Sequence, residues 1–190
     1  MAGTNKRNKL ISNGPCIILK DPQLPENIGM CARSMLNYGF SDLRIVNPKK
    51  AFPNDRAISA SAGAFDKIVK STRVISNFKE AMKSVQILFA TSVRVRDLEK
   101  NILTPREAIK LIIEKYKHRK IGFLFGPEKA GLINTDLSEA NFIIQIPTNP
   151  GFGSLNLAMA VNIICYEWFI NFHKKVSTKI KKNIVLADKE

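Results

Sequence analysis

The chain has 190 residues, 45% of them hydrophobic and 24% charged, and its 30 Lys and Arg against 16 Asp and Glu give a formal net charge of +14. This length fits one domain with a sizeable core, and the positive excess favours a polyanionic partner, nucleic acid or an acidic membrane surface, although a merely solubilising surface would carry the same charge. Widely spaced cysteines (Cys16, Cys31 and Cys165) and isolated histidines (His118 and His173) argue against a disulfide framework and a structural metal, as expected of a cytoplasmic protein.

Both ends of the chain are basic and flank the globular part. Residues 1–14 are expected to form a flexible basic leader, with an arm that contacts phosphates as the alternative. No apolar run follows the basic residues, so they are not expected to be a secretory signal. Residues 174–190 are expected to form a basic tail. The predicted domain therefore spans residues 15–173.

The first predicted elements are a strand, a helix and a second strand. Cys16–Leu19 is a short apolar run suited to a buried strand, and two prolines in the loop that follows exclude a helix there. Asn27 is expected to cap a helix that runs to about Tyr38, where Gly39 can supply a left-handed residue after the helix. Leu43–Val46 is expected to be the next strand.

The middle of the chain carries weaker signals, apart from one helix start. Thr104-Pro105-Arg106-Glu107 combines a capping threonine, a proline at the first helical position and a glutamate three residues after the cap. The elements expected in this part are a short helix within Arg56–Phe65, edge strands at Ile68–Val69 and Val74–Ile75, a helix Phe78–Lys83 capped by Asn77, a strand Val85–Ala90, and a helix from Thr104 to near Tyr116.

The segment 121–160 is the most informative. Two apolar runs, Ile121–Phe125 and Phe142–Ile146, have the length of buried strands, and each is followed at once by Gly- and Pro-rich turns. Since open α/β sheets bind ligands beyond the carboxyl ends of their strands, we expect one site built from both loops. Ser154 is expected to open the last helix, and Leu155–Phe172 carries polar residues that favour a packed helix over a membrane span.

Strands that alternate with helices predict an α/β fold with a mainly parallel sheet and right-handed crossovers. The sequence lacks the Gly-x-Gly-x-x-Gly pattern of dinucleotide-binding folds and the Gly-Lys-Ser/Thr loop of nucleoside triphosphatases. Taken singly, the polar residues near the predicted loops also have structural explanations: surface exposure for Arg33, and helix capping for Asn27, Glu128, Ser154 and Asn156.

Three ordered motifs carry a family resemblance over residues 15–169. The motifs are Pro25-Glu26-Asn27-Ile28-Gly29-Met30-Cys31-Ala32-Arg33, Leu124-Phe125-Gly126-Pro127-Glu128-Lys129-Ala130-Gly131-Leu132, and Ile146-Pro147 followed by Ser154-Leu155-Asn156-Leu157-Ala158-Met159-Ala160-Val161. In these motifs the chain resembles the SpoU (TrmH-like) RNA 2′-O-ribose methyltransferases of the SPOUT superfamily, and it is most similar to the TrmJ-like branch, which methylates the first nucleotide of the tRNA anticodon loop.

The resemblance implies a Rossmann-like SPOUT sheet flanked by helices, a deep C-terminal trefoil knot, a homodimer with Leu155–Phe172 as an interface helix, and S-adenosylmethionine as methyl donor. It also implies a cofactor site formed by Thr91, Ser92, Val93, Gly126, Ile146, Gly153, Ser154 and Leu155. The substrate implied is RNA, most specifically tRNA; an rRNA substrate, a catalytically silent RNA-binding protein of the same fold, and a membrane-surface protein are the alternatives, the last lacking an amphipathic anchor.

The resemblance further implies that Arg33 meets the two loops in space and acts on the ribose hydroxyl. A guanidinium whose pKa lies above about 12 is a poor base, so we expect Arg33 to grip the adjacent phosphate and stabilise the oxyanion. Asn27, Ser154 and Asn156 are expected to orient this arrangement, and Glu128 to order the loops.

Overall fold

The computed structural model of the protein describes residues 10–64, 66–68, 71–93 and 100–173. Most of the expected leader (1–14) and all of the expected basic tail (174–190) lie outside the described residues.

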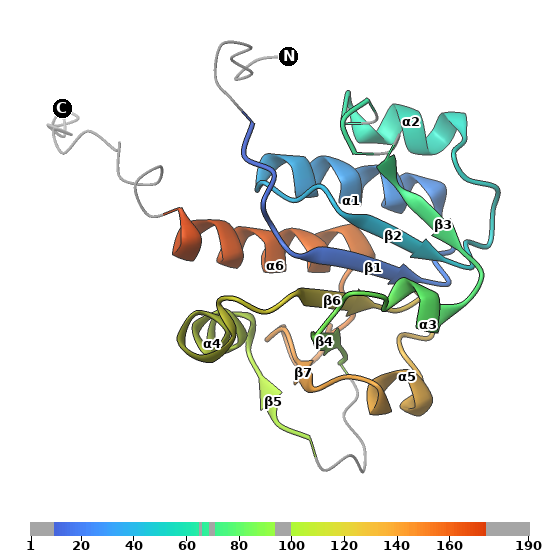
Figure 1. Ribbon diagram of the computed structural model, residues 1–190. Helices are drawn as coiled ribbons and strands as arrows, with labels where there is room; N and C mark the ends of the chain where they lie inside the picture. The colour runs from blue at the N-terminus through green and yellow to red at the C-terminus, as the bar shows by residue number, and fades with distance from the viewer. Residues whose placement is uncertain (1–9, 65, 69–70, 94–99, 174–190) are drawn as a thin grey trace, which may run out of the picture.

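One parallel sheet organises the described part of the chain (Figure 1). Its strands follow the order β3-β2-β1-β6-β4-β7-β5, and every neighbouring pair is parallel. This confirms the α/β parallel fold expected from the sequence. The strands are β1 (Cys16–Lys20), β2 (Leu43–Val46), β3 (Arg73–Ile75), β4 (Ile87–Thr91), β5 (Ile102–Leu103), β6 (Ile121–Phe125) and β7 (Phe142–Ile144).

Helices cover both faces of the sheet. The helical elements are α1 (Pro25–Asn37), α2 (Asp55–Ser61), α3 (Phe78–Ala81), α4 (Pro105–Leu111), the π-helical turn η2 (Ile112–Tyr116), α5 (Asn134–Ser138) and α6 (Leu157–Phe172). Helices α1, α4 and α6 contribute to the core on one face, and α3 and α5 to the core on the other. Figure 1 shows α1 beside α6, with α2 lying over α1.

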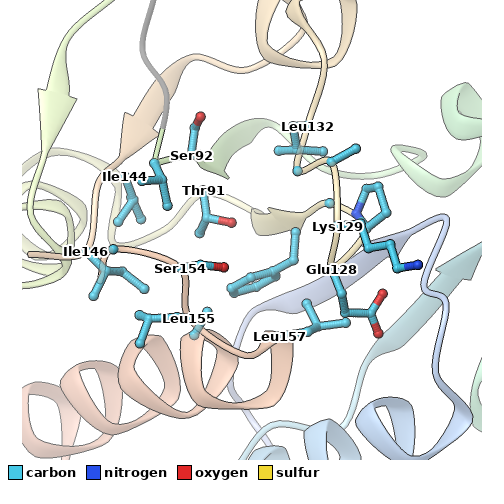
Figure 2. A pocket seen from close by; sticks show the side chains of 18 of the residues that line it. Thr91, Ser92, Glu128, Lys129, Leu132, Ile144, Ile146, Ser154, Leu155 and Leu157 are labelled. Atoms are coloured by element: carbon cyan, nitrogen blue, oxygen red, sulfur yellow. The ribbon is translucent and has the colours of Figure 1, made fainter. Parts of the chain in front are cut away.

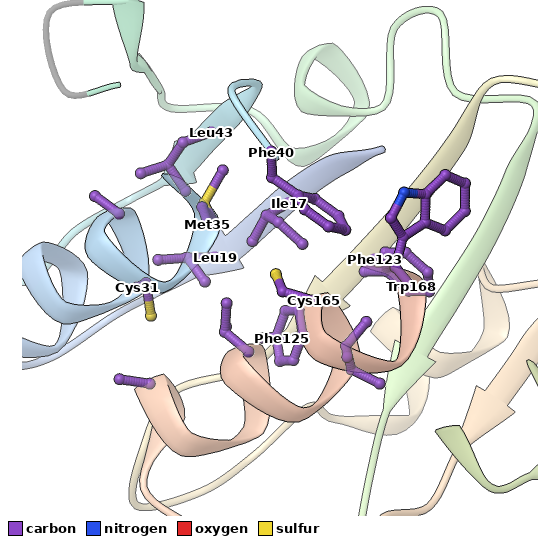
Figure 3. Packing of buried hydrophobic residues seen from close by; sticks show 14 of the residues in the cluster. Ile17, Leu19, Cys31, Met35, Phe40, Leu43, Phe123, Phe125, Cys165 and Trp168 are labelled. Carbon is purple, nitrogen blue, oxygen red and sulfur yellow. The ribbon is translucent and has the colours of Figure 1, made fainter. Parts of the chain in front are cut away.

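Because both faces are covered, the central strands are mostly apolar, with polar residues such as Lys20 and Thr91 at their carboxyl ends. Along β1, Ile17 and Leu19 enter the core under α1 and α6, whereas Ile18 enters the core on the opposite face. Figure 3 shows Cys165 and Trp168 of α6 directed towards the same core. Near-continuous apolar runs are typical of parallel strands buried on both sides.

Two expected helix starts are wrong. Pro25 occupies the first turn of α1 after Leu24, so Asn27 lies inside the helix instead of capping it. Likewise α6 begins at Leu157, and its cap is Asn156, whose side chain accepts a 2.8 Å hydrogen bond from the Ala158 N–H; Ser154 does not open the helix.

Other local signals are confirmed. Thr104 and Glu107 form the predicted capping box of α4, and Gly39 has a φ of +80° after α1. The helix expected to reach Tyr116 continues to that residue as η2. The strand expected over Phe142–Ile146 ends at Ile144, and two short elements, β5 and α5, were not expected.

Candidate active site

The loops that follow β4, β6 and β7 enclose a cavity of about 440 Å³ at the carboxyl ends of the strands (Figure 2). Its size falls in the range of small-molecule sites. Every residue that the sequence predicted to hold a cofactor lines it: Thr91, Ser92, Val93, Gly126, Ile146, Gly153, Ser154 and Leu155.

The cavity has an apolar side and a polar side. Figure 2 shows Ile144, Ile146 and Leu155 on one side, and the loop carrying Glu128 and Lys129 on the other. Such a slot suits a flat ring bound between aliphatic side chains, with a charged group at the polar side.

The hydroxyl groups in this cavity differ in availability. The Thr91 hydroxyl donates a 3.1 Å hydrogen bond to the Leu124 carbonyl, which joins the end of β4 to β6. The exposed Ser154 hydroxyl, by contrast, makes no hydrogen bond within the part of the chain that the structure describes. Ser154 is therefore the better placed of the two to contact a ligand.

Gly126 allows the loop after β6 to fold back over the strand end. A Cβ atom at this position would lie 2.5 Å from the Leu132 nitrogen and 2.6 Å from the Gly131 carbonyl carbon. Both neighbours are backbone atoms of the same loop, which is closed by a 2.8 Å hydrogen bond from the Gly131 N–H to the Pro127 carbonyl. Only glycine can be accommodated at position 126, because any side chain would clash with the backbone of the loop.

The loop between β7 and α6 is fixed by its own polar groups. The Gln145 amide donates to the Val93 carbonyl at 3.2 Å, and the Thr148 hydroxyl donates to the Gly153 carbonyl at 3.3 Å. Phe152 lies at the tip of this loop with 80% of its surface exposed.

A chain of hydrogen bonds joins the three motifs beside the cavity. The Glu128 carboxylate accepts hydrogen bonds from the backbone N–H groups of Gln23 (2.8 Å) and Leu24 (3.2 Å), and from the Asn27 amide (2.7 Å). Asn27, buried with only 2% of its surface exposed, accepts a 2.9 Å hydrogen bond from the Asn156 amide. Of the residues that the sequence predicted to orient the site and its loops, Asn27 thus contacts both Asn156 and Glu128, whereas Ser154 is outside this chain of hydrogen bonds. Glu128 ties the loop before α1 to the loop after β6.

Arg33 lies apart from this group. It is exposed on the outer face of α1 together with Met30 and Asn37, and it is not among the residues that line the cavity. Within the described residues it makes no hydrogen bond or ion pair. A single chain therefore does not bring Arg33 to its own cavity.

The cysteines are buried and poorly suited to nucleophilic chemistry. Burial raises the pKa of the Cys16 thiol to about 12 and raises the pKa values of Cys31 and Cys165, with the Glu128 charge as a smaller cause at Cys31. Because the thiolate is the reactive form, none of these groups is an activated nucleophile near neutral pH.

Metal-binding clusters and membrane-spanning helices are both absent from residues 10–173, outside the gaps given above. No cluster of His, Cys, Asp and Glu side chains there could hold a metal ion. None of the helices in that part of the chain has the length and apolar character needed to span a bilayer.

Comparison with known proteins gives consistent results. The model of the SpoU rRNA methylase family matches residues 14–166. The tRNA (cytidine/uridine/adenosine-2′-O-)-methyltransferase TrmJ of Pseudomonas aeruginosa is 38% identical over 152 residues, which are 80% of this chain and 58% of that protein. A protein of Haemophilus influenzae named as an uncharacterized tRNA/rRNA methyltransferase is 37% identical over 177 residues, 90% of this chain and 71% of that protein.

A solved structure shares the fold. The crystal structure of TrmJ from Z. mobilis ZM4 superposes with a TM-score of 0.76 and 46% identity, over 82% of this chain and 68% of that chain.

Proposed function

This chain belongs to the SpoU rRNA methylase family, and on that premise we propose that it transfers the methyl group of S-adenosylmethionine to a ribose 2′-hydroxyl of RNA. The observation that carries the proposal is the hydrogen-bonded chain of Glu128, Asn27 and Asn156 at the edge of the cavity. It joins the first motif to two others that lie more than a hundred residues further along the sequence.

The RNA that we propose as substrate is tRNA, methylated in the anticodon loop. Relatives named as tRNA 2′-O-methyltransferases are 37% to 40% identical to this chain over 80% of its length. The net charge of +14 supports a polyanionic substrate. A tRNA substrate would place the protein in the cytoplasm. Residues 15–173 would form its methyltransferase domain.

The cavity fits the proposed cofactor. Ile144, Ile146 and Leu155 would hold the adenosine, with Gly126 and Gly153 also lining the cavity. When bound, S-adenosylmethionine supplies a methyl group on a sulfonium, which is already a good electrophile.

The protein groups must then position the ribose hydroxyl and stabilise its developing charge. Holding the reacting atoms in line accounts for much of the rate enhancement of such transfers. Ser154 would contact the substrate, because its hydroxyl is exposed on the cavity wall. Asn27 and Asn156 would act as positioning residues, because their amides are already engaged with each other.

We include a homodimer in the proposal. Met30 of α1 and Met159 and Tyr166 of α6 are 38%, 58% and 46% exposed, and apolar groups gathered on one surface are typical of interfaces. The two helices present this surface as a unit, since the Ser34 hydroxyl donates a 2.7 Å hydrogen bond to the Asn162 side chain between them.

The dimer would also account for the position of Arg33. This residue projects from the same outer side of α1 as Met30, so a second copy packed on α1 and α6 could receive Arg33 at its own site. There the guanidinium would bind the phosphate beside the reacting ribose and stabilise the oxyanion.

Titration calorimetry with S-adenosylmethionine tests the cofactor assignment. We expect one molecule bound per chain, and loss of binding when Leu155→Asp places a charge in the apolar side of the cavity. A wild-type protein that binds RNA but not S-adenosylmethionine would be a catalytically silent RNA-binding protein, and the proposal would fail.

A further inference from the structure

A second cavity, of about 450 Å³, lies at the amino ends of the strands, opposite the candidate active site. Cys16 at the start of β1 and Ile121 at the start of β6 line it, whereas the candidate active site lies where the strands end. A strand of five residues spans about 17 Å at roughly 3.3 Å per residue. The two cavities are therefore separated by about the length of one strand.

The rim of the second cavity carries unbalanced positive charge. The turn between η2 and β6 places consecutive basic side chains there, and all are exposed: Lys117, His118, Arg119 and Lys120. None of them makes an ion pair within the described residues. The nearby carboxylate of Glu114 is paired with Lys110 on the helix.

The acidic residue of this cavity does not neutralise the rim. Asp42 is bound by Arg44 at 2.7 Å and by Arg73 at 3.1 Å, so two guanidinium groups share one carboxylate. The same partners lower the pKa of Asp42 against the opposing effect of its burial, so the carboxylate remains ionised and committed to this cluster.

Hydrogen bonds of Arg44 and a stacked aromatic pair fix the floor of the cavity. Arg44 donates hydrogen bonds to the carbonyls of Ala81 (2.7 Å) and Lys83 (2.8 Å). Trp168 and Phe172 stack with ring centroids 3.8 Å apart and planes 12° apart. A recess with a cationic rim and an aromatic wall suits a sugar-phosphate unit better than it suits a simple anion.

The Trp168 wall of the cavity faces away from the proposed dimer surface. Residues 166 and 168 of α6 point about 200° apart at roughly 100° per residue, so the Trp168 side faces away from the surface that carries Tyr166. Figure 3 shows Trp168 on the side of α6 that meets the sheet.

We propose that this second cavity docks the sugar-phosphate backbone of the substrate RNA, away from the nucleotide that is methylated. This inference rests on the proposed function and extends it. The active site receives the target ribose, while the cavity at the amino ends of the strands binds the body of the RNA. Exposed cations bind a single phosphate weakly, but along a polymer each contact adds through the release of counterions.

The test compares two triple variants that remove the same charge. Lys117→Gln, Arg119→Gln and Lys120→Gln alter the rim; the matched control carries Lys50→Gln, Lys67→Gln and Lys79→Gln, exposed lysines that line neither cavity. Fluorescence anisotropy measures the affinity for full-length tRNA over a range of KCl concentrations.

We expect the rim variant to bind about tenfold more weakly, and the slope of log K against log salt to fall by about 2, at roughly 0.7 to 0.9 per lost phosphate contact. The control variant should change affinity less than about twofold, since its charges act only through the general field. Equal losses in the two variants would overturn the inference, because net charge alone would then explain the binding.

Three further measurements separate this inference from the proposed function. The rim variant should raise KM for tRNA while kcat and the affinity for S-adenosylmethionine stay unchanged, and a short anticodon stem-loop should bind both triple variants equally. If the rim variant lost as much affinity for the stem-loop as for full-length tRNA, docking of the RNA body would be contradicted. If wild-type protein bound tRNA through the rim but transferred no methyl group, the proposed function would fail and the docking site would stand.

Discussion

Single polar residues hold the candidate site together, and Glu128 has the most partners among them. Its carboxylate accepts from two backbone N–H groups and from the Asn27 amide, and a carboxylate is suited to this because it only accepts when ionised. Since the N–H groups of Gln23 and Leu24 belong to the loop before α1, Glu128 positions a second motif besides its own.

Glu128→Gln is therefore expected to cost about 1–3 kcal/mol of folding stability, because the amide NH₂ cannot accept and at least one donor loses its partner. Urea denaturation measures this, and calorimetry should show weaker binding of S-adenosylmethionine. The matched control is Glu114→Gln, which removes an exposed i,i+4 ion pair and should cost about 0.5 kcal/mol or less. If the two variants had equal stability, the hydrogen bonds to Glu128 would not contribute to the free energy of unfolding.

Arg33→Lys tests the role of the arginine. Lysine keeps the charge but loses the planar fork of donors, so kcat should fall by about 10²-fold, as when one oxyanion donor is lost, with unchanged affinity for S-adenosylmethionine. Turnover close to that of the wild type would show that the bidentate contact is dispensable.

The sequence predicted these residues better than it predicted their positions. Asn27 was expected at a helix cap, but Pro25 takes the start of α1 and moves Asn27 into the first turn, where it reaches both Glu128 and Asn156. For Arg33, spacing along the helix could not reveal its face, because α2, α6 and the sheet together decide which side of α1 is covered.

Among the elements, loops after parallel strands form the site, and their backbone geometry is as specific as their side chains. Gly126→Ala should prevent the loop after β6 from closing, because the new methyl group would meet backbone atoms at 2.5 and 2.6 Å. We expect a loss of at least about 2 kcal/mol of stability, or a loop displaced from its place.

Gly151→Ala is the matched control in the neighbouring loop. A Cβ atom there would meet only the Asn149 side-chain oxygen, at 3.5 Å, which is ordinary contact. Its melting temperature and its binding of S-adenosylmethionine should stay near wild type. A Gly126→Ala protein that behaved like this control would refute the close-approach argument.

Strong local signals explain which elements the sequence revealed. Strand β6 is a continuous apolar run bounded by a turn, β1 and β2 are apolar apart from Lys20 and Arg44, and α4 carries a full capping box. Strand β5 has two residues and α5 has five, too few to show a period, so tertiary packing determines them. The start of α6 was misplaced because Ser154 and Asn156 are both good caps, and the Ala158 N–H bonds to Asn156.

At the level of the whole molecule, the proposed reaction requires two chains. The trefoil knot implied by the family resemblance stays a prediction, since strand order does not define how the chain threads. The dimer likewise stays a proposal, and it is supported by the exposed apolar side of α1 and α6 and by the position of Arg33 outside the cavity.

Met30→Glu combined with Met159→Glu should yield a monomer, because two carboxylates would enter the apolar interface in each copy. Sedimentation velocity measures the mass, and methyl transfer should fall with dimer content because Arg33 no longer reaches a second site. Val74→Glu, at a half-exposed position on the edge strand β3, is the control and should leave the mass unchanged. A double variant that stayed dimeric would place the interface elsewhere.

The decisive measurement is transfer of labelled methyl from S-adenosylmethionine to tRNA, followed by mapping of the modified nucleotide. We expect one 2′-O-methyl ribose in the anticodon loop, formed by the wild type and reduced at least about tenfold by Asn27→Ala, which breaks the contacts to Glu128 and Asn156. Label on a base, or no transfer by a protein that binds both S-adenosylmethionine and tRNA, would contradict it.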